Sequence, residues 1–342
     1  MNYKTSPPAP LPLEGSLKAN NMAVFWMCQR VTIGGQVLKG ITEVETETSV
    51  ESLSDTAKIV LPFKIHGVIF DVEKRFKRGD AIKIELGYNG KYQTEFEGFV
   101  RTISANNPCM IECEDWMFRM RKEVALKAFV NVSVDTILKY VCEQVGGFKL
   151  QSTVGDLKYD KFVIRNATGY EVLEKIRQQF GISIYAKPGA IVANLKFTEK
   201  TGAVEIDMDR NVKAASLQYI KETDIKVQVK VKGVKKDNTA TKEITVGSKG
   251  GEVVTMPDQT NISDEKSLEA KAKEYLKTLT YTGYRGDITT FGRPFCDLGF
   301  SARVIDPDFP DRTGNYYVKG VKVKFSIGSG YQRTVQLGRK LT

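Results

Sequence analysis

The strongest constraint on the fold of this 342-residue chain is an alternation of apolar and polar residues with a period of two. In Gly79–Leu86, apolar residues at every second position from Ile82 alternate with lysine and glutamate, which is typical of a strand with one buried face. Asn89-Gly90 follows, and this dipeptide supplies the positive φ angles of a type I′ turn. Tyr92–Ile103 is therefore predicted to return antiparallel as the second strand of a hairpin.

The alternation fills two blocks of the chain, residues 29–128 and residues 204–342. In the first block, further short strands are expected at Arg30–Val37, Ile41–Thr48 and Ala57–Leu61. In the second block, strands are expected at Ile225–Lys232 and Val321–Gly328, with one helix at Ser263–Thr280. Runs of short antiparallel strands favour closed architectures. Each block is therefore predicted to form an antiparallel β-barrel, and the second barrel is predicted to carry the helix.

Residues 129–203, between the two blocks, have apolar residues at helical spacing instead. Ser133 is a suitable N-cap for a first helix. Thr168 and Glu171 have the spacing of a capping box, in which each side chain satisfies a backbone amide at the start of a second helix. Strands are expected at Ser183–Ala186 and Ile191–Phe197. This segment is therefore predicted to be a small α/β insert, which makes the whole fold mainly β with an α+β insert.

Residues 1–28 are predicted to form an extended N-terminal arm. Residues 1–16 include prolines at positions 7, 8, 10 and 12 and lack the apolar core of a signal peptide. No stretch of the sequence approaches the ~18 apolar residues that a membrane span needs. The five cysteines are odd in number and scattered, which favours reduced thiols over a disulfide framework. The chain is therefore expected to remain in the cytoplasm where it is made.

The net charge of +10 raises the question of a polyanionic partner. Lys226, Lys230 and Lys232 lie on one predicted strand. Proteins that bind single strands combine such charge with aromatic side chains for base stacking, yet no aromatic residue occurs between Asp224 and Asp237. The three lysines are therefore predicted to form an assembly or lumen surface, and an OB-like nucleic-acid-binding β-barrel is the alternative function.

The sequence contains no complete set of residues for nucleophilic, metal or phosphate chemistry. His66 is the only histidine and is followed by a glycine in a predicted turn, so we interpret it as a solvated turn residue. Cys109 and Cys113 supply two ligands where a structural zinc site needs three or four. The sequence has no phosphate-binding loop of the Gly-x-x-x-x-Gly-Lys type. No cofactor and no metal site are predicted.

Paired carboxylates need separate attention, because glycosidases use two of them. Glu95 with Glu97, and Glu112 with Glu114, are two positions apart on predicted strands and are expected to share a solvated strand face. The loop Asp306–Asp311 lacks the glycine and distal glutamate of an EF-hand and is interpreted as a proline-stiffened turn. A cell-wall hydrolase is therefore only a third hypothesis, and the chain is predicted not to be an enzyme.

Several segments resemble the baseplate hub family of bacteriophage tails, which includes Mu-like tail proteins, late control D proteins and the hub part of the type VI secretion spike. The similar segments of the first block are Val31–Val37, Ser49–Ala57, Arg78–Tyr88 and Phe96–Val100. Those of the second block are Asp297–Gly299, Gly314–Val321 and Gly330–Leu337. The N-terminal arm has no counterpart in this family that can be placed.

The resemblance implies a homotrimer in which two barrels per chain build a pseudo-six-fold ring. Such a ring is a structural hub that joins a hexameric tail tube to a trimeric puncturing spike and forms part of the channel. The implied partners are a tail tube or distal tail protein, a separate spike protein, baseplate wedge components and DNA in transient passage. The implied location is the tail baseplate of a virion that is assembled in the bacterial cytoplasm.

Overall fold

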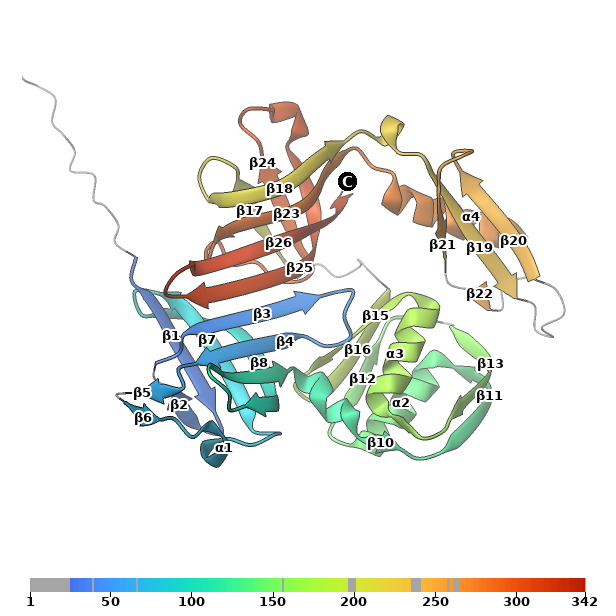
Figure 1. Ribbon diagram of the computed structural model, residues 1–342. Helices are drawn as coiled ribbons and strands as arrows, with labels where there is room; N and C mark the ends of the chain where they lie inside the picture. The colour runs from blue at the N-terminus through green and yellow to red at the C-terminus, as the bar shows by residue number, and fades with distance from the viewer. Residues whose placement is uncertain are drawn as a thin grey trace, which may run out of the picture.

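The computed structural model describes residues 25–38, 40–65, 67–155, 157–195, 201–234, 241–256, 259–260 and 265–341 (Figure 1). Its largest element is a 13-stranded sheet. The first block contributes β1 (Met27–Ile33), β2 (Gln36–Leu38), β3 (Glu43–Ser49), β4 (Thr56–Leu61), β7 (Ala81–Tyr88), β8 (Lys91–Ser104) and β9 (Cys109–Glu114). The second block contributes β17 (Gly202–Asp207), β18 (Val212–Ile220), β23 (Gly283–Phe291), β24 (Phe300–Ile305), β25 (Gly314–Ser326) and β26 (Gly330–Leu341).

The two blocks are joined where β3 pairs antiparallel with β25, so the sheet order is β18-β23-β26-β25-β3-β4-β9-β8-β7-β1-β2, with β24 and then β17 branching from β25. We call the β3–β25 pairing the seam. The expected mainly β fold with antiparallel pairing is present, but the described residues do not show two closed barrels. The sheet is continuous across the blocks, and β17 pairs with β24 in parallel. The physical reason is that the β25–β26 hairpin satisfies the backbone edge of β3, which a separate barrel would satisfy within its own block.

The predicted hairpin is confirmed, and it contains an irregularity. Asn89 and Gly90 occupy the turn with φ of 53° and 75°. The pairing of β7 with β8 shifts from Ile84↔Phe96 to Glu85↔Thr94, which leaves Glu95 without a partner across the ladder. Such a β-bulge re-aims the extra side chain. Strand β1 starts at Met27, within the predicted arm of residues 1–28, and residues 1–24 of that segment lie outside the described residues.

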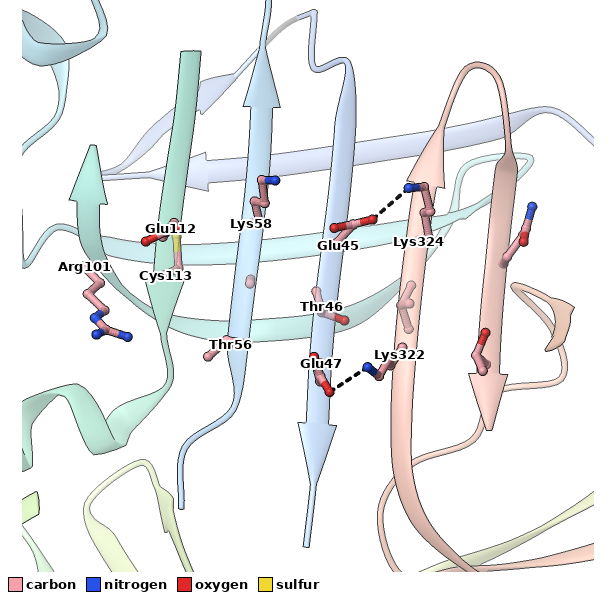
Figure 2. A pocket seen from close by; sticks show the side chains of 14 residues that line it. Glu45, Thr46, Glu47, Thr56, Lys58, Arg101, Glu112, Cys113, Lys322 and Lys324 are labelled. Atoms are coloured by element: carbon pink, nitrogen blue, oxygen red, sulfur yellow. Dashed lines mark hydrogen bonds and ion pairs between the residues drawn. The ribbon is translucent and has the colours of Figure 1, made fainter. Parts of the chain in front are cut away.

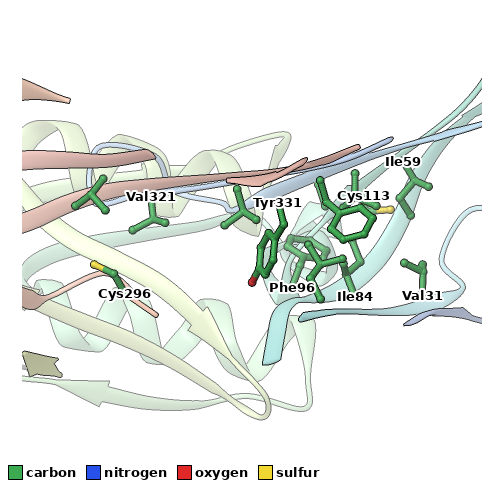
Figure 3. Close-up of a cluster of buried hydrophobic side chains, with 14 of the residues drawn as sticks. Val31, Ile59, Ile84, Phe96, Cys113, Cys296, Val321 and Tyr331 are labelled. Atoms are coloured by element: carbon green, nitrogen blue, oxygen red, sulfur yellow. The ribbon is translucent and has the colours of Figure 1, made fainter. Parts of the chain in front are cut away.

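One apolar core lies on one face of the sheet and spans both blocks. Val31, Ile84 and Phe96 from the first block pack in the same cluster as Val321 and Tyr331 from the second (Figure 3). Because side chains alternate between the two faces of a strand, the period-two pattern places all of these on one side. The seam therefore joins the two blocks through packing as well as through backbone hydrogen bonds.

The insert has a core of its own and both predicted helices. Its elements are β10 (Glu123–Val124), β11 (Lys127–Ser133), α2 (Val134–Val145), β12 (Lys149–Ser152), β13 (Lys158–Ile164), β14 (Ala167–Thr168), α3 (Gly169–Phe180), β15 (Ile182–Lys187) and β16 (Ala190–Leu195). Ser133 caps α2, and the Thr168–Glu171 capping box is present at the start of α3. Met117 and Met120, from the 3-10 helix Trp116–Arg121, belong to this core. The insert core therefore begins before residue 129.

A second small unit lies within the second block. It consists of β19 (Val227–Val234), β20 (Thr241–Gly247), β21 (Glu252–Thr255), β22 (Gln259–Thr260) and α4 (Glu265–Leu279). Its strands form a separate sheet, and Val229, Val231, Leu268 and Ala272 form its core. The expectation that the lysine strand and the helix belong to the second barrel needs correction, because the apolar face of this strand packs on α4. We call these elements the α4 unit.

The remaining short elements are β5 (Lys64–Ile65), β6 (Val68–Ile69), α1 (Val72–Arg75) and the 3-10 helices Glu222–Asp224 and Pro310–Arg312. None of the described helices combines the length and the apolar character that a membrane crossing requires.

Candidate functional site

The surface that both blocks build together is the polar face of the sheet at the seam. We call it the seam face; it carries Glu45 and Glu47 on β3, Lys58 on β4, Glu112 on β9, and Lys322 and Lys324 on β25 (Figure 2). The register places Lys324, Glu45, Lys58 and Glu112 in one row across four strands. Charges of opposite sign therefore stand next to each other along this row.

The ion pairs of the seam face cross the boundary between the blocks. Lys324 Nζ lies 2.8 Å from Glu45 Oε1, and Lys322 Nζ lies 2.9 Å from Glu47 Oε1. These side chains are about half exposed, and a cross-strand pair of this kind contributes roughly 0.2–1 kcal/mol. The two ion pairs thus favour the β3–β25 register, but their free energy is too small to account for the pairing of these strands by itself.

A hollow of about 560 Å³ lies over the seam face. Its lining includes lysine, arginine, glutamate and threonine side chains, and none of the described lining residues is aromatic. A small-molecule site is usually apolar with a few polar groups, and a single-strand groove stacks bases on aromatic rings. The hollow fits neither description, and its mixed charges suit contact with water or with another polar protein surface.

Beneath the seam face, a buried ion pair connects the blocks. Arg333 Nη2 on β26 lies 2.6 Å from Glu95 Oε1 on β8, and both side chains are 2% exposed. The Tyr331 hydroxyl donates to the same carboxylate at 2.5 Å, and Arg333 Nη1 donates to the Cys296 carbonyl at 2.9 Å. Burial raises the pKa of the Glu95 carboxyl, although the positive charge of Arg333 opposes this rise.

The two members of each carboxylate pair that the sequence suggested differ in exposure and in bonding partner. The bulge buries Glu95, whereas Glu97 is exposed and lies 3.1 Å from Lys83 Nζ. Glu112 accepts a hydrogen bond from Thr102, whereas Glu114 is 1% exposed and holds Arg121 with two bonds of 2.7 and 2.8 Å. The expectation of two solvated pairs is therefore wrong for Glu95 and Glu114.

The other candidate residues have structural surroundings. Cys109 and Cys113 share the buried face of β9, and burial raises the pKa of both thiols. Among the described residues no group of three or more His, Cys, Asp or Glu side chains is placed to hold a metal ion. His66 lies outside the described residues. In the loop Asp306–Asp311, Asp306 accepts hydrogen bonds from Phe309 N and the Tyr284 hydroxyl, which fix the turn.

The predicted lysine surface lies on the α4 unit, away from the main sheet. Lys230 Nζ is 2.5 Å and Lys232 Nζ is 3.9 Å from the carboxylate of Glu243 on β20, while Lys226 is exposed just before β19. The structure therefore brings two of the three lysines together around one acidic partner. Their role in assembly or in a lumen stays a prediction.

Sequence reasoning missed a second buried cluster, where the first block meets the insert. Asp115 caps the 3-10 helix through Met117 N at 2.9 Å, and Ser54 Oγ donates to the same oxygen at 3.0 Å. Burial raises the pKa of Asp115 to about 7. Burial and the nearby carboxylates of Asp115 and Asp297 also raise the pKa of Asp55. We call Asp55 and Asp115 the carboxyl pair.

The missed residues differ in the signal that they leave in the sequence. Arg333 falls at an inward position of the pattern Tyr331-x-Arg333-x-Val335, so a buried arginine with a partner was detectable. The bulge that turns Glu95 inward leaves no such local signal, because both neighbouring residues continue the strand.

Comparisons with known proteins connect this architecture to tail machines. No family model matches the sequence, and no curated protein is significantly similar to it. The 43 kDa tail protein of prophage MuSo2 from Shewanella oneidensis superposes with a TM-score of 0.66 at 14% identity, covering 92% of this chain and 98% of that chain. The tail protein from Neisseria meningitidis MC58 gives 0.63 at 14% identity, with 92% and 96% covered.

A secretion protein has a similar architecture. The E. coli c3393 protein, described as a type VI secretion component with structural similarity to T4 bacteriophage tail proteins, gives a TM-score of 0.58 at 10% identity, covering 90% of this chain and 76% of that chain. These matches include both β blocks and the insert, so the expected resemblance is confirmed at the level of the fold. The chain has the fold of phage tail proteins and of this type VI secretion component.

Proposed function

We propose that the chain is a structural baseplate hub subunit of a phage tail or tail-like injection machine. The observation that carries the proposal is the fold match to two tail proteins, which covers more than nine-tenths of both chains in each case. Because fold alone does not define function, the proposal also rests on the surface of the molecule. The seam face, which both blocks build, is polar and carries charges of both signs. Such a surface suits assembly better than substrate binding.

In this proposal three copies close into a pseudo-six-fold ring, with two β blocks from each chain. At one end of the described sheet β18 has a single neighbour, β23, and at the other end β2 covers only residues 31–33 of β1. Unpaired strand edges are prone to uncontrolled pairing. A closed symmetric ring covers them and prevents open filament growth.

The proposed ring joins a tail tube or distal tail protein on one side to a separate puncturing spike on the other, next to baseplate wedge components. It forms part of the channel and contacts DNA only in passage. The proposed location is the tail baseplate of a particle assembled in the bacterial cytoplasm. The proposed role is structural and needs no catalytic group. Glu95, Glu97, Glu112 and Glu114 each have a partner of their own, an ion pair or a hydrogen bond, which supports this reading.

No specific observation on the described residues favours the alternative function, a nucleic-acid-binding β-barrel. Lys230 and Lys232 both lie close to Glu243, which reduces the positive potential that a phosphate backbone needs. Any DNA binding should therefore be weak, indifferent to sequence and lost with rising salt.

Mass measurement in solution tests the proposal. Light scattering of the purified chain should give about three times its 38.2 kDa. A chain that stays monomeric at high micromolar concentration, also after mixing with its spike and tube proteins, would contradict the hub assignment.

A further inference from the structure

A second hollow, of about 590 Å³, lies where the two blocks, the insert and the α4 unit meet. Its lining includes residues from α3 of the insert, from α4, from β23, β25 and β26 of the second block, and from the loop after β3 in the first block. Four of the described lining residues are cationic and one is acidic: Arg177, Arg285, Lys319 and Arg339 against Glu51. We call this hollow the basic pocket.

The acidic residue of the basic pocket offsets only part of the positive charge. The Glu51 side chain is 63% exposed, and its Oε1 lies 3.9 Å from Lys319 Nζ, which is a long ion pair. Arg177 is paired with Glu174 through two hydrogen bonds of 2.7 and 2.8 Å, and it also donates to the Glu51 carbonyl at 2.7 Å. Among the described lining residues, an excess of positive charge therefore remains on the second block.

Arg285 is held in place at the basic pocket with part of its hydrogen-bonding capacity unused. Its Nη2 donates to the Leu279 carbonyl at the end of α4, and its guanidinium lies 4.8 Å from the centre of the Tyr281 ring. The Tyr281 hydroxyl in turn donates to the Gly338 carbonyl at 2.9 Å. Arg285 Nε is buried and has no acceptor among the described residues. A buried donor without an acceptor is costly, and an anion in the adjoining pocket would supply acceptors for this guanidinium.

The size and the residue types of the basic pocket suit a phosphate-bearing ligand. The planar guanidinium of arginine matches the geometry of phosphate oxygens, and lysine adds a compact positive charge. The volume lies within the range of about 300–1,000 Å³ that is usual for small-molecule sites, and Tyr275 and Leu337 line an apolar part of the hollow. We propose that the basic pocket binds a small molecule with two or more linked phosphate groups, held by Arg285, Lys319 and Arg339.

The basic pocket requires the folded chain. Its lining residues extend from Glu51 to Arg339 in the sequence, so they come together only when the blocks, the insert and the α4 unit are assembled. A ligand that binds the folded state alone stabilises it, and the proposed ligand should therefore raise the melting temperature. The proposal concerns the binding chemistry of one chain and does not depend on the hub assignment.

Thermal unfolding and titration calorimetry with tripolyphosphate test the proposal. The full-length chain is measured in about 0.15 M salt, where exposed charges more than ~8 Å apart are largely screened. Tripolyphosphate should raise the melting temperature and should bind as a single molecule per chain. Arg285→Gln and Lys319→Gln should each weaken its binding about tenfold or more, because each removes a charge-assisted hydrogen bond to a phosphate oxygen.

A charge change of opposite sign and a matched control sharpen the test. Glu51→Gln removes the acidic lining residue and keeps the backbone carbonyl that Arg177 uses, so it should strengthen tripolyphosphate binding several-fold. Arg303→Gln should leave binding unchanged, because Arg303 is 59% exposed and pairs with Glu205 on another part of the second block. The melting temperature of each variant without ligand reports its folding, and Lys319 is exposed enough, at 35%, for its replacement to be tolerated.

Three results would overturn the proposal. The first is that tripolyphosphate does not bind. The second is that Arg303→Gln weakens binding as much as Lys319→Gln, which would mean that the ligand responds only to the net charge of +10. The third is that a hexaglutamate peptide binds more tightly than tripolyphosphate and loses affinity in Lys319→Gln, which would assign the basic pocket to an acidic protein segment.

Discussion

Two buried polar junctions hold this molecule together, and they differ in charge balance. Beneath the seam face, the Glu95 carboxylate on β8 faces the Arg333 guanidinium on β26 at 2.6 Å. At the junction with the insert, Asp115 of the carboxyl pair accepts hydrogen bonds from a hydroxyl and a backbone amide. Burial is the main cause that raises the pKa of both Asp55 and Asp115, and no positive charge contributes to either shift. A buried charge is tolerated only with a partner or with a proton. The junction beneath the seam face therefore uses an ion pair, and the insert junction uses protonation.

Breaking the ion pair should have the largest effect. Arg333→Leu leaves a buried carboxyl without its counter-charge, and we expect it to lower the free energy of unfolding by about 3–5 kcal/mol in urea titrations. The matched control is Arg303→Leu, because Arg303 is 59% exposed and pairs with Glu205 at 3.5 Å. Arg303→Leu should lower the free energy of unfolding by less than about 1 kcal/mol. Equal losses in the two variants would remove the distinction between the seam and an ordinary surface pair.

The double variant Glu95→Leu, Arg333→Leu sharpens this prediction. It removes both charges, so the penalty for an unpaired buried group disappears. We expect it to be more stable than Arg333→Leu alone. A double variant less stable than either single variant would mean that packing, rather than charge pairing, decides the stability of the seam.

The insert junction should respond to pH with a moderate effect. The pKa of Asp115 is raised to about 7, above the unfolded value of about 3.9, so the folded state holds a proton that the unfolded state releases. Its stabilising contribution is present at low pH and is lost as the pH rises through 7. Between pH 5.5 and pH 8, the titration of Asp115 should lower the free energy of unfolding by about 2 kcal/mol.

Thermal or urea unfolding across this pH range measures the effect. Asp115→Asn keeps an oxygen acceptor for Met117 N and does not titrate, so its stability should vary less with pH than that of the native chain. Asp71→Asn is the control, because Asp71 is solvent-exposed and its pKa is lowered by Lys74 rather than raised. A pH slope that survives Asp115→Asn unchanged would disprove the protonated junction.

The seam face should contribute least. Glu45→Gln removes the 2.8 Å pair with Lys324, and we expect a loss below about 1 kcal/mol because both side chains are partly exposed. In about 1 M salt, where the Debye length is ~3 Å, the difference from the native chain should vanish. A large, salt-independent loss would show that the seam face, rather than the buried ion pair, holds the blocks together.

Local features of the fold were predictable from the sequence. The Asn89-Gly90 hairpin and the Thr168–Glu171 capping box depend on neighbours within a few residues, and both are present. The seam was not predictable in this way. Glu45 and Lys324 are 279 positions apart, and a period-two pattern defines the face of a strand but not its partner.

The α4 unit illustrates the same limit. The alternation of valine and lysine indicated a strand at Ile225–Lys232, which overlaps β19 at Val227–Val234. It did not reveal that α4 rather than the main sheet covers the valines. The bulge at Glu95 is a further case, because an extra residue in one strand is visible only when the opposite strand is known. The junctions that hold the units together were therefore the least predictable part.

Electron microscopy of the purified assembly tests the central claim most directly. If the chain is a tail hub, class averages should show closed rings of three copies in which the two β blocks of each chain alternate around a pseudo-six-fold axis. Isolated monomers, or open filaments in place of rings, would contradict the account.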